Sequence, residues 1–140
     1  GVVKVISQYH HSDEKLWCKI GRYFASREIR AELGGAMSSD DNYHWFIATD
    51  KQGEVTGFAA VELKKSGAWF RHSYVFEASR HNGVYGELLK ARMSFVKQQD
   101  PDACPMITCT ATEDSLPSLL KLGFKEIALK GKCHTLRLKF

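Results

Sequence analysis

The chain has 140 residues and a formal net charge of +4, and 44% of its residues are hydrophobic while 26% are charged. These values are typical of a globular protein, so we expect one domain over residues 1–140. No run of about 18 apolar residues occurs and no secretory signal is visible, which argues against a membrane protein and favours a cytoplasmic one.

A strand and two helices are predicted at the start of the chain. Residues 2–9 include several β-branched side chains, which favour a strand. Ser12 is the expected N-cap of a helix, because apolar residues then recur at helical spacing from Leu16 to Phe24. A second helix is predicted over residues 27–33, and Gly34-Gly35 ends it.

Three strands follow the helices. Residues 44–49 and 55–64 flank the turn sequence Asp50-Lys51-Gln52-Gly53, which indicates a hairpin. After the turn at residues 65–67, the run from Ala68 to Phe76 predicts the next strand.

The second half of the chain alternates between helices and strands. We predict a helix over residues 87–97, a buried strand over 106–110, a helix over 113–122, and a final strand pair at 125–130 and 133–140. The whole order is β-α-α-β-β-β-α-β-α-β-β. It predicts an α/β fold in which helices cover a mixed sheet.

A glycine-bearing turn joins the strand at 68–76 to the helix at 87–97. Its sequence is Arg80-His81-Asn82-Gly83-Val84-Tyr85-Gly86. A strand, such a turn and a helix place free backbone N–H groups at a helix N-terminus, where the helix dipole is positive. The turn is therefore a predicted phosphate-binding site.

Neither cysteines nor histidines show the spacing of a metal site. The cysteines lack C-x-x-C pairs and are too few for a disulfide scaffold, and His10, His11 and His44 have no ligand spacing. We expect reduced thiols and no metal. The cysteines are Cys18, Cys104, Cys109 and Cys133.

Three sequence motifs follow one another along the chain. They are the strand segments Trp45–Ala48 and Val55–Ala59, the turn segment Arg80–Val84, and the segment Leu120–Phe124. Over almost the whole chain, these motifs resemble the GNAT superfamily of N-acetyltransferases. They resemble, in order, its second and third strands, its Q/R-x-x-G-x-G/A loop up to the last position, and its K-L-G-F signature.

The resemblance implies a fold and a cosubstrate. The fold would be a mixed, mostly antiparallel sheet with a splayed central strand pair and about four flanking helices. The cosubstrate would be acetyl-CoA, with its pyrophosphate on the turn and its pantetheine along the preceding strand. The implied cofactor-binding residues are Tyr74, Val75, Phe76, Arg80, His81, Asn82, Gly83, Val84, Tyr85, Gly86, Thr112 and Ser115.

The chain departs from the family pattern at three positions. Tyr85 stands where the loop ends in Gly or Ala, Leu119 replaces a tyrosine that often serves as general acid, and Thr112 replaces an asparagine. CoA binding is therefore better supported than the family's usual proton delivery.

Acyl transfer to an amine needs a base for the amine and an acid for the leaving thiolate. His72, Glu77 and Glu62 are the candidate bases, and an exposed or ion-paired surface residue is the alternative for each. Tyr85, Tyr74 and Ser118 are the candidate acids, and a packing role is the alternative for Tyr85. The predicted catalytic set is His72, Glu77 and Tyr85, with the Val75 N–H polarising the thioester carbonyl.

The sequence thus predicts an N-acyltransferase that moves an acetyl group from acetyl-CoA to an amine by direct attack in a ternary complex. The acceptor would be a small molecule or a protein amine. Two alternatives stay open: a non-catalytic CoA-binding or regulatory module, and a nucleic-acid-associated modifier, which no motif supports. A homodimer also stays open.

Overall fold

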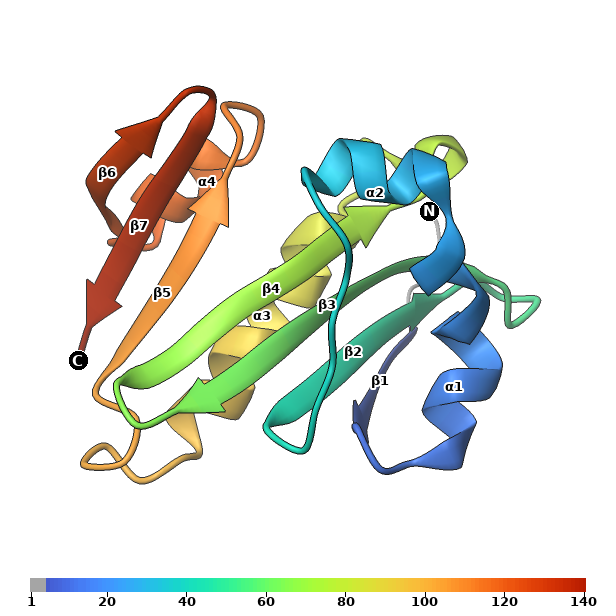
Figure 1. The fold of residues 1–140 in the computed structure, drawn as a ribbon, viewed down its shortest axis with the longest axis horizontal. Helices are drawn as coiled ribbons and strands as arrows, with labels where there is room; N and C mark the ends of the chain where they lie inside the picture. The colour runs from blue at the N-terminus through green and yellow to red at the C-terminus, as the bar shows by residue number, and fades with distance from the viewer. Residues whose placement is uncertain (1–4) are drawn as a thin grey trace.

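The computed structural model describes residues 5–140, and the described part contains seven strands, four α-helices and two short 3-10 helices (Figure 1). The predicted order of strands and α-helices is confirmed, and residues 2–4 of the first predicted strand lie outside the described residues. The elements are β1 (Val5–His10), α1 (Glu14–Ile20), η1 (Gly21–Ala25), α2 (Arg27–Leu33), β2 (Tyr43–Thr49), β3 (Val55–Lys64), β4 (Gly67–Val75), η2 (Glu77–Ser79), α3 (Val84–Lys97), β5 (Met106–Ala111), α4 (Leu116–Lys121), β6 (Lys125–Lys130) and β7 (Cys133–Lys139).

One mixed sheet holds all seven strands in the order β1-β2-β3-β4-β5-β7-β6. Neighbours pair antiparallel except β4 and β5, which run parallel and pair only at Ala68–Ile107, Trp69–Thr108 and Phe70–Cys109. Beyond Phe70 the two strands diverge, β4 toward Val75 and β5 toward Ala111 (Figure 1). The predicted splayed central pair is therefore present.

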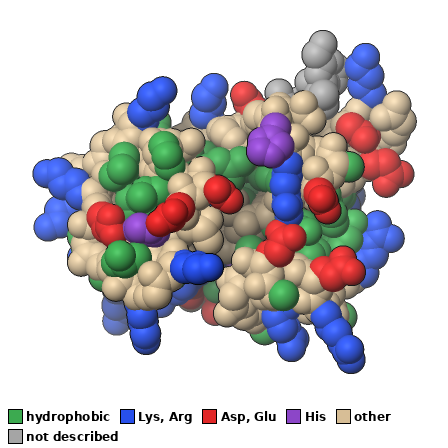
Figure 2. Space-filling model, turned by 90° about the horizontal axis from the view of Figure 1, so that it is seen from above, with side chains coloured by type: hydrophobic (Ala, Val, Ile, Leu, Met, Phe, Trp, Pro, Cys, Tyr) green, Lys and Arg blue, Asp and Glu red, His purple; other side chains and the backbone are tan. Residues whose placement is uncertain are grey.

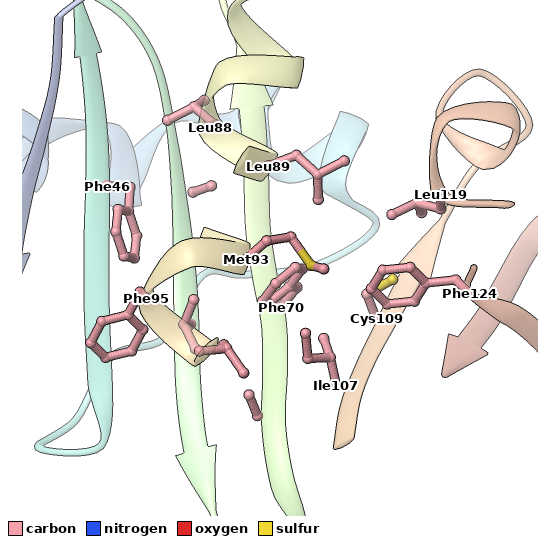
Figure 3. Packing of buried hydrophobic residues seen from close by; sticks show 14 of the residues in the cluster. Phe46, Phe70, Leu88, Leu89, Met93, Phe95, Ile107, Cys109, Leu119 and Phe124 are labelled. Atoms are coloured by element: carbon pink, nitrogen blue, oxygen red, sulfur yellow. The ribbon is translucent and has the colours of Figure 1, made fainter. Parts of the chain in front are cut away.

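Helices cover both faces of the sheet. On one face, the apolar side of α3 packs with residues of β2 to β5, β7 and α4 in one buried cluster (Figure 3). On the other face, α1, η1 and α2 pack against β2 and β3 around Trp45 and Phe58. The first cluster includes Phe70 from one diverging arm and Cys109 and Leu119 from the other, so a single core holds both arms. Among residues 5–140, no helix is long and apolar enough to cross a membrane.

The helix after the turn starts earlier than we predicted. It begins at Val84, not at residue 87, because Val84 is 1% exposed and packs under β3 in the core. Gly83 is the N-cap, with a left-handed φ of 82° that glycine adopts without strain. Tyr85 and Gly86 therefore belong to the first turn of α3 and not to the loop.

Other element boundaries also differ from the prediction. The first helix is capped by Asp13 and not by Ser12, and it continues beyond Ile20 only as a 3-10 helix. The last helix spans only Leu116–Lys121, because residues 113–115 form a turn in which Ser115 N donates to Thr112 O. This turn leaves Thr112 and Ser115 at the mouth of the splay.

A β-bulge lies in β4 at the start of the divergence. Phe58 pairs with Tyr74 but Ala60 pairs with Arg71, so His72 and Ser73 together face one residue of β3. His72 has a left-handed φ of 52°, which is uncommon outside glycine. Such bulges bend a strand and redirect its side chains.

The turn into β4 gives a stability prediction. Gly67 has φ 129°, and a Cβ there would clash with the carbonyl oxygen of Met106 at the start of β5. We expect Gly67→Ala to lower the free energy of unfolding by about 3 kcal/mol, measured by urea denaturation. Gly131→Ala is the control, because Gly131 also has a positive φ (62°) but an added Cβ meets nothing within 4 Å. Gly131→Ala should lower the free energy of unfolding by about 1 kcal/mol, because only the backbone strain is added. Equal losses would contradict the predicted clash.

Candidate functional site

The divergence of β4 and β5 opens a cleft of about 780 Å³. Residues 70–75 of β4 and 109–112 at the end of β5 form its two sides, and residues 32–36 at the end of α2 border it on one face. Tyr85 and Arg92 of α3 reach it from the other face. Figure 2 looks onto this end of the molecule and shows a hollow between two groups of side chains.

The edge of β4 that faces the cleft lacks a strand partner. Within the described chain, the β5 ladder stops at Phe70 while the opposite edge of β4 stays paired with β3 up to Val75. The Phe76 N–H donates to Thr56 O at 3.0 Å, which continues the pairing with the β3 side and leaves this group unavailable to the cleft. Main-chain groups between the bulge and Val75 are therefore available to an extended ligand.

Free backbone donors lie next to this edge. The first helical hydrogen bond of α3 runs from Glu87 N to Gly83 O at 3.1 Å, so the N–H groups of Val84, Tyr85 and Gly86 precede the helical ladder. Gly83 supplies no side-chain cap. With the positive end of the helix dipole, these free donors make the cleft mouth electrostatically favourable for an anion.

Arg80 crosses the mouth of the cleft. Its Nε donates to the Val75 carbonyl at 2.9 Å, and its terminal nitrogen forms an ion pair with Glu32 of α2. Its guanidinium also lies 5.5 Å from the centre of the Tyr74 ring. The predicted phosphate donor is therefore engaged by a carboxylate and by the β4 main chain.

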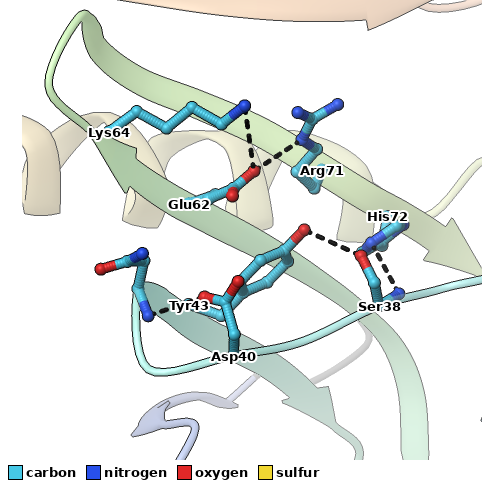
Figure 4. A network of polar contacts seen from close by, with 8 residues as sticks. Ser38, Asp40, Tyr43, Glu62, Lys64, Arg71 and His72 are labelled. Carbon is cyan, nitrogen blue, oxygen red and sulfur yellow. Dashed lines mark hydrogen bonds and ion pairs between the residues drawn. The ribbon is translucent and has the colours of Figure 1, made fainter.

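His72 lies on the bulge and is held from three sides (Figure 4). Its Nε2 accepts a hydrogen bond from Ser38 N–H at 3.1 Å, and its ring stacks on Tyr43 and Trp45. Burial, followed by the nearby Arg71 charge, lowers the pKa of His72 to about 4. The ring is neutral at neutral pH, and its Nε2 lone pair already has a donor.

The two carboxylates proposed as bases do not line the cleft. Glu62 is largely buried and accepts from Arg71 at 3.1 Å, with Lys64 at 4.0 Å (Figure 4). Glu77 is exposed on η2. Of the candidate acids, Ser118 is exposed on α4 outside the cleft.

Tyr85 reaches the cleft from the first turn of α3. Burial raises the pKa of its hydroxyl above the usual value, against the lowering effects of the neighbouring Arg92 guanidinium and the Ser115 side chain. Tyr85 is therefore protonated at neutral pH. Its neighbours place the hydroxyl between α3 and the N-terminus of α4, on the side of the cleft where Leu119 is buried.

Neither a scan against protein-family models nor a search of curated protein sequences gives a match. Solved structures do match. ElaA from Escherichia coli aligns with a TM-score of 0.77 at 14% identity, over 98% of this chain and 100% of that one. A GNAT-family acetyltransferase from Staphylococcus aureus aligns with a TM-score of 0.67 at 12% identity, over 96% and 99%. The chain has the GNAT fold. A GNAT-family acetyltransferase from Elizabethkingia anophelis, solved with acetyl-CoA bound, aligns with a TM-score of 0.62 at 12% identity, over 98% of each chain.

The GNAT fold brings about half of the predicted site residues to the cleft. Those that line it are His72, Tyr74, Val75, Arg80, His81, Tyr85, Thr112 and Ser115. Those outside its lining are Phe76, Glu77, Asn82, Gly83, Val84 and Gly86. Of the second group, Gly83, Val84 and Gly86 still form the α3 N-terminus at the mouth.

Several cleft residues of this GNAT fold were not predicted from the sequence, among them Glu32, Ser73 and Arg92. Glu32 and Ser73 carry no local signal, although the Ser73 hydroxyl is buried and has no hydrogen-bond partner among the described residues. Arg92 does carry a local signal in the sequence, because it falls between Leu88 and Val96 on the apolar face of a predicted helix. An arginine at helical spacing within an apolar stripe is unusual enough to mark a site.

His72 gives a pH prediction for this bulge. The pKa of about 4 lies below the ordinary value of 6.5, so the unfolded chain binds a proton that the folded protein excludes. This contribution to stability is complete above the ordinary pKa and is lost as the pH falls toward 4. Between neutral pH and about pH 4.5, the free energy of unfolding of His72→Asn should fall by about 2 kcal/mol less than that of the parent, measured by urea denaturation.

Asparagine suits this test because it tolerates a positive φ. His81→Asn is the matched control, since His81 also has a positive φ (66°) but is exposed. The pH dependence of the control should follow the parent. If the stability of His72→Asn depended on pH in the same way as that of the parent, the lowered pKa of His72 would be contradicted.

Proposed function

We propose that this protein is an acyltransferase that binds acyl-CoA in the β4–β5 cleft and transfers the acyl group to an amine. The observation that carries the proposal is the unpaired edge of β4 leading directly to the free N–H groups of α3. Acetyl-CoA in the Elizabethkingia anophelis structure of the same fold supports the choice of cosubstrate.

The cleft suits both halves of CoA. Pantetheine is an extended chain with two amides, so it can add to the β4 edge as a strand does. The diphosphate then meets the N–H groups of Val84, Tyr85 and Gly86. Arg80 adds a charged donor once it leaves Glu32 and the Val75 carbonyl.

The chemistry is direct attack by a neutral amine on the thioester carbon. The new C–N bond forms and the C–S bond breaks, and a main-chain N–H of β4 near the bulge stabilises the oxyanion. Tyr85 gives its proton to the leaving thiolate, in place of the tyrosine that the family pattern has at Leu119. For His72 to accept the amine proton, Nε2 must first lose the Ser38 N–H.

Substitutions of Arg80 and Glu32 should change the affinity for acetyl-CoA in opposite directions. Removing the charged donor in Arg80→Gln should weaken acetyl-CoA binding about tenfold. Glu32→Gln should tighten binding several-fold, because Arg80 no longer has to break an ion pair. Affinity is measured by titration calorimetry, and a rise of the melting temperature with acetyl-CoA provides a second readout.

Arg27→Gln is the control, because Arg27 is an exposed arginine at the other end of α2. Its affinity should equal that of the parent. No binding of acetyl-CoA by the parent at saturating concentration would refute the proposed cosubstrate.

Tyr85 gives a turnover test. Tyr85→Phe should lower the rate of CoA release with pooled amine acceptors about 100-fold while acetyl-CoA affinity stays constant, because only the proton donor is lost. Tyr9→Phe on β1, outside the cleft, is the control. CoA is measured by chromatography, since exposed Cys18 and Cys133 also react with thiol reagents. An unchanged rate in Tyr85→Phe would remove it as the acid.

A CoA-binding module without turnover is the second candidate, and the buried Leu119 at the position of the usual tyrosine favours it. The same experiment separates the two. Binding of acetyl-CoA without CoA release for any amine class would support the module.

A further inference from the structure

Arg92 is a buried cation that has no counter-charge within the described part of the chain. It is 2% exposed, its Nε donates weakly to the Leu88 carbonyl at 3.4 Å, and its guanidinium lies 4.5 Å from the centre of the Phe70 ring. No carboxylate between residues 5 and 140 forms an ion pair with it. Burying such a charge unpaired is strongly unfavourable, so its presence requires an explanation.

The neighbours of Arg92 do not supply a negative charge. Burial lowers the pKa of its guanidinium, and the adjacent Tyr85 hydroxyl and Cys109 thiol act against that effect. Burial also raises the pKa of Tyr85, and it raises the pKa of Cys109 to about 11. Both neighbours are therefore neutral at neutral pH, and the positive charge is left uncompensated.

The position of Arg92 connects this charge to the ligand cleft. Arg92 lines the cleft beside Phe70 and Cys109, the last pair before β4 and β5 diverge, which is the closed end of the opening. Along α3 it lies about 12 Å from the N-terminal donors at the mouth. A CoA whose diphosphate occupies the mouth points its acyl end toward this closed end.

We propose that Arg92 binds a carboxylate at the end of the acyl group, so that the preferred donor is the CoA thioester of a dicarboxylic acid such as succinate. This inference rests on the proposed acyltransferase function. The planar guanidinium fork can form two parallel hydrogen bonds to a carboxylate. An acetyl group carries no charge and leaves Arg92 unpaired, so the site discriminates against it by the cost of that unpaired cation.

The test uses two unreactive CoA thioethers, one ending in butanoic acid and the other in butanamide. They differ only in the terminal group. We expect the acid to bind about tenfold more tightly than the amide by titration calorimetry, because the acid adds a charged pair to the same contacts.

Arg92→Met should reduce the preference for the acid to about twofold or less while the amide keeps its affinity, since methionine fills a similar volume without charge. Arg92→Lys keeps the charge without the fork and should give an intermediate preference, which also covers the case in which the methionine variant does not fold. Lys90→Met is the matched control. Lys90 is an exposed cation on the same helix and does not line the cleft, so the preference should not change.

The outcomes separate this inference from the proposed function. Binding of neither thioether, nor of CoA, would overturn the acyltransferase proposal itself. Equal binding of acid and amide would overturn the role of Arg92 and leave the acyltransferase proposal standing. A preference for the acid that survives in Arg92→Met would also overturn the inference. If the parent showed no preference for the acid and Arg92→Met released CoA more slowly, the inference would also be overturned. Arg92 would then be a residue that stabilises the leaving thiolate.

Discussion

Three residue pairs join β4 to β5, and the ladder ends at Phe70 and Cys109. The site depends on this short ladder, because an unpaired main chain exists only where the ladder has ended. The arms cannot separate further, since one core beneath them includes Phe70, Cys109 and Leu119 (Figure 3). Closure is opposed by the β4 bulge and by the side chains of Tyr85 and Arg92, which fill the α3 face of the opening.

The bulge links this opening to the opposite face of the sheet. It turns the His72 ring onto Tyr43 and Trp45, where Ser38 N–H binds its Nε2 (Figure 4). The segment after α2 is thereby fixed over β4 and forms one border of the cleft. In this arrangement His72 is a positioning residue for the cleft wall as long as that hydrogen bond persists.

Arg80 and Arg92, two of the arginines that line the cleft, are in opposite electrostatic states. Arg80 at the mouth is partly exposed and paired with Glu32, so solvent screens the pair and its exchange for a phosphate costs little. Arg92 at the closed end is buried and unpaired, so an incoming anion there gains the full benefit of a poorly solvated cation. The mouth therefore suits the diphosphate, which every acyl-CoA shares, while the closed end suits discrimination between acyl groups.

The order of the elements and the glycine-bearing turn before α3 can be read from the sequence alone. Alternation, helical spacing and glycine positions are local properties of the backbone, so they are readable without a fold. The start of α3 was misplaced because burial of Val84, a long-range contact, extends the helix. The sequence does not show where the β4–β5 ladder ends, which lone pair of His72 is occupied, or that Arg92 is buried without a carboxylate partner among residues 5–140. These properties depend on register, on the bulge and on contacts between residues distant in the chain, and no local pattern encodes them.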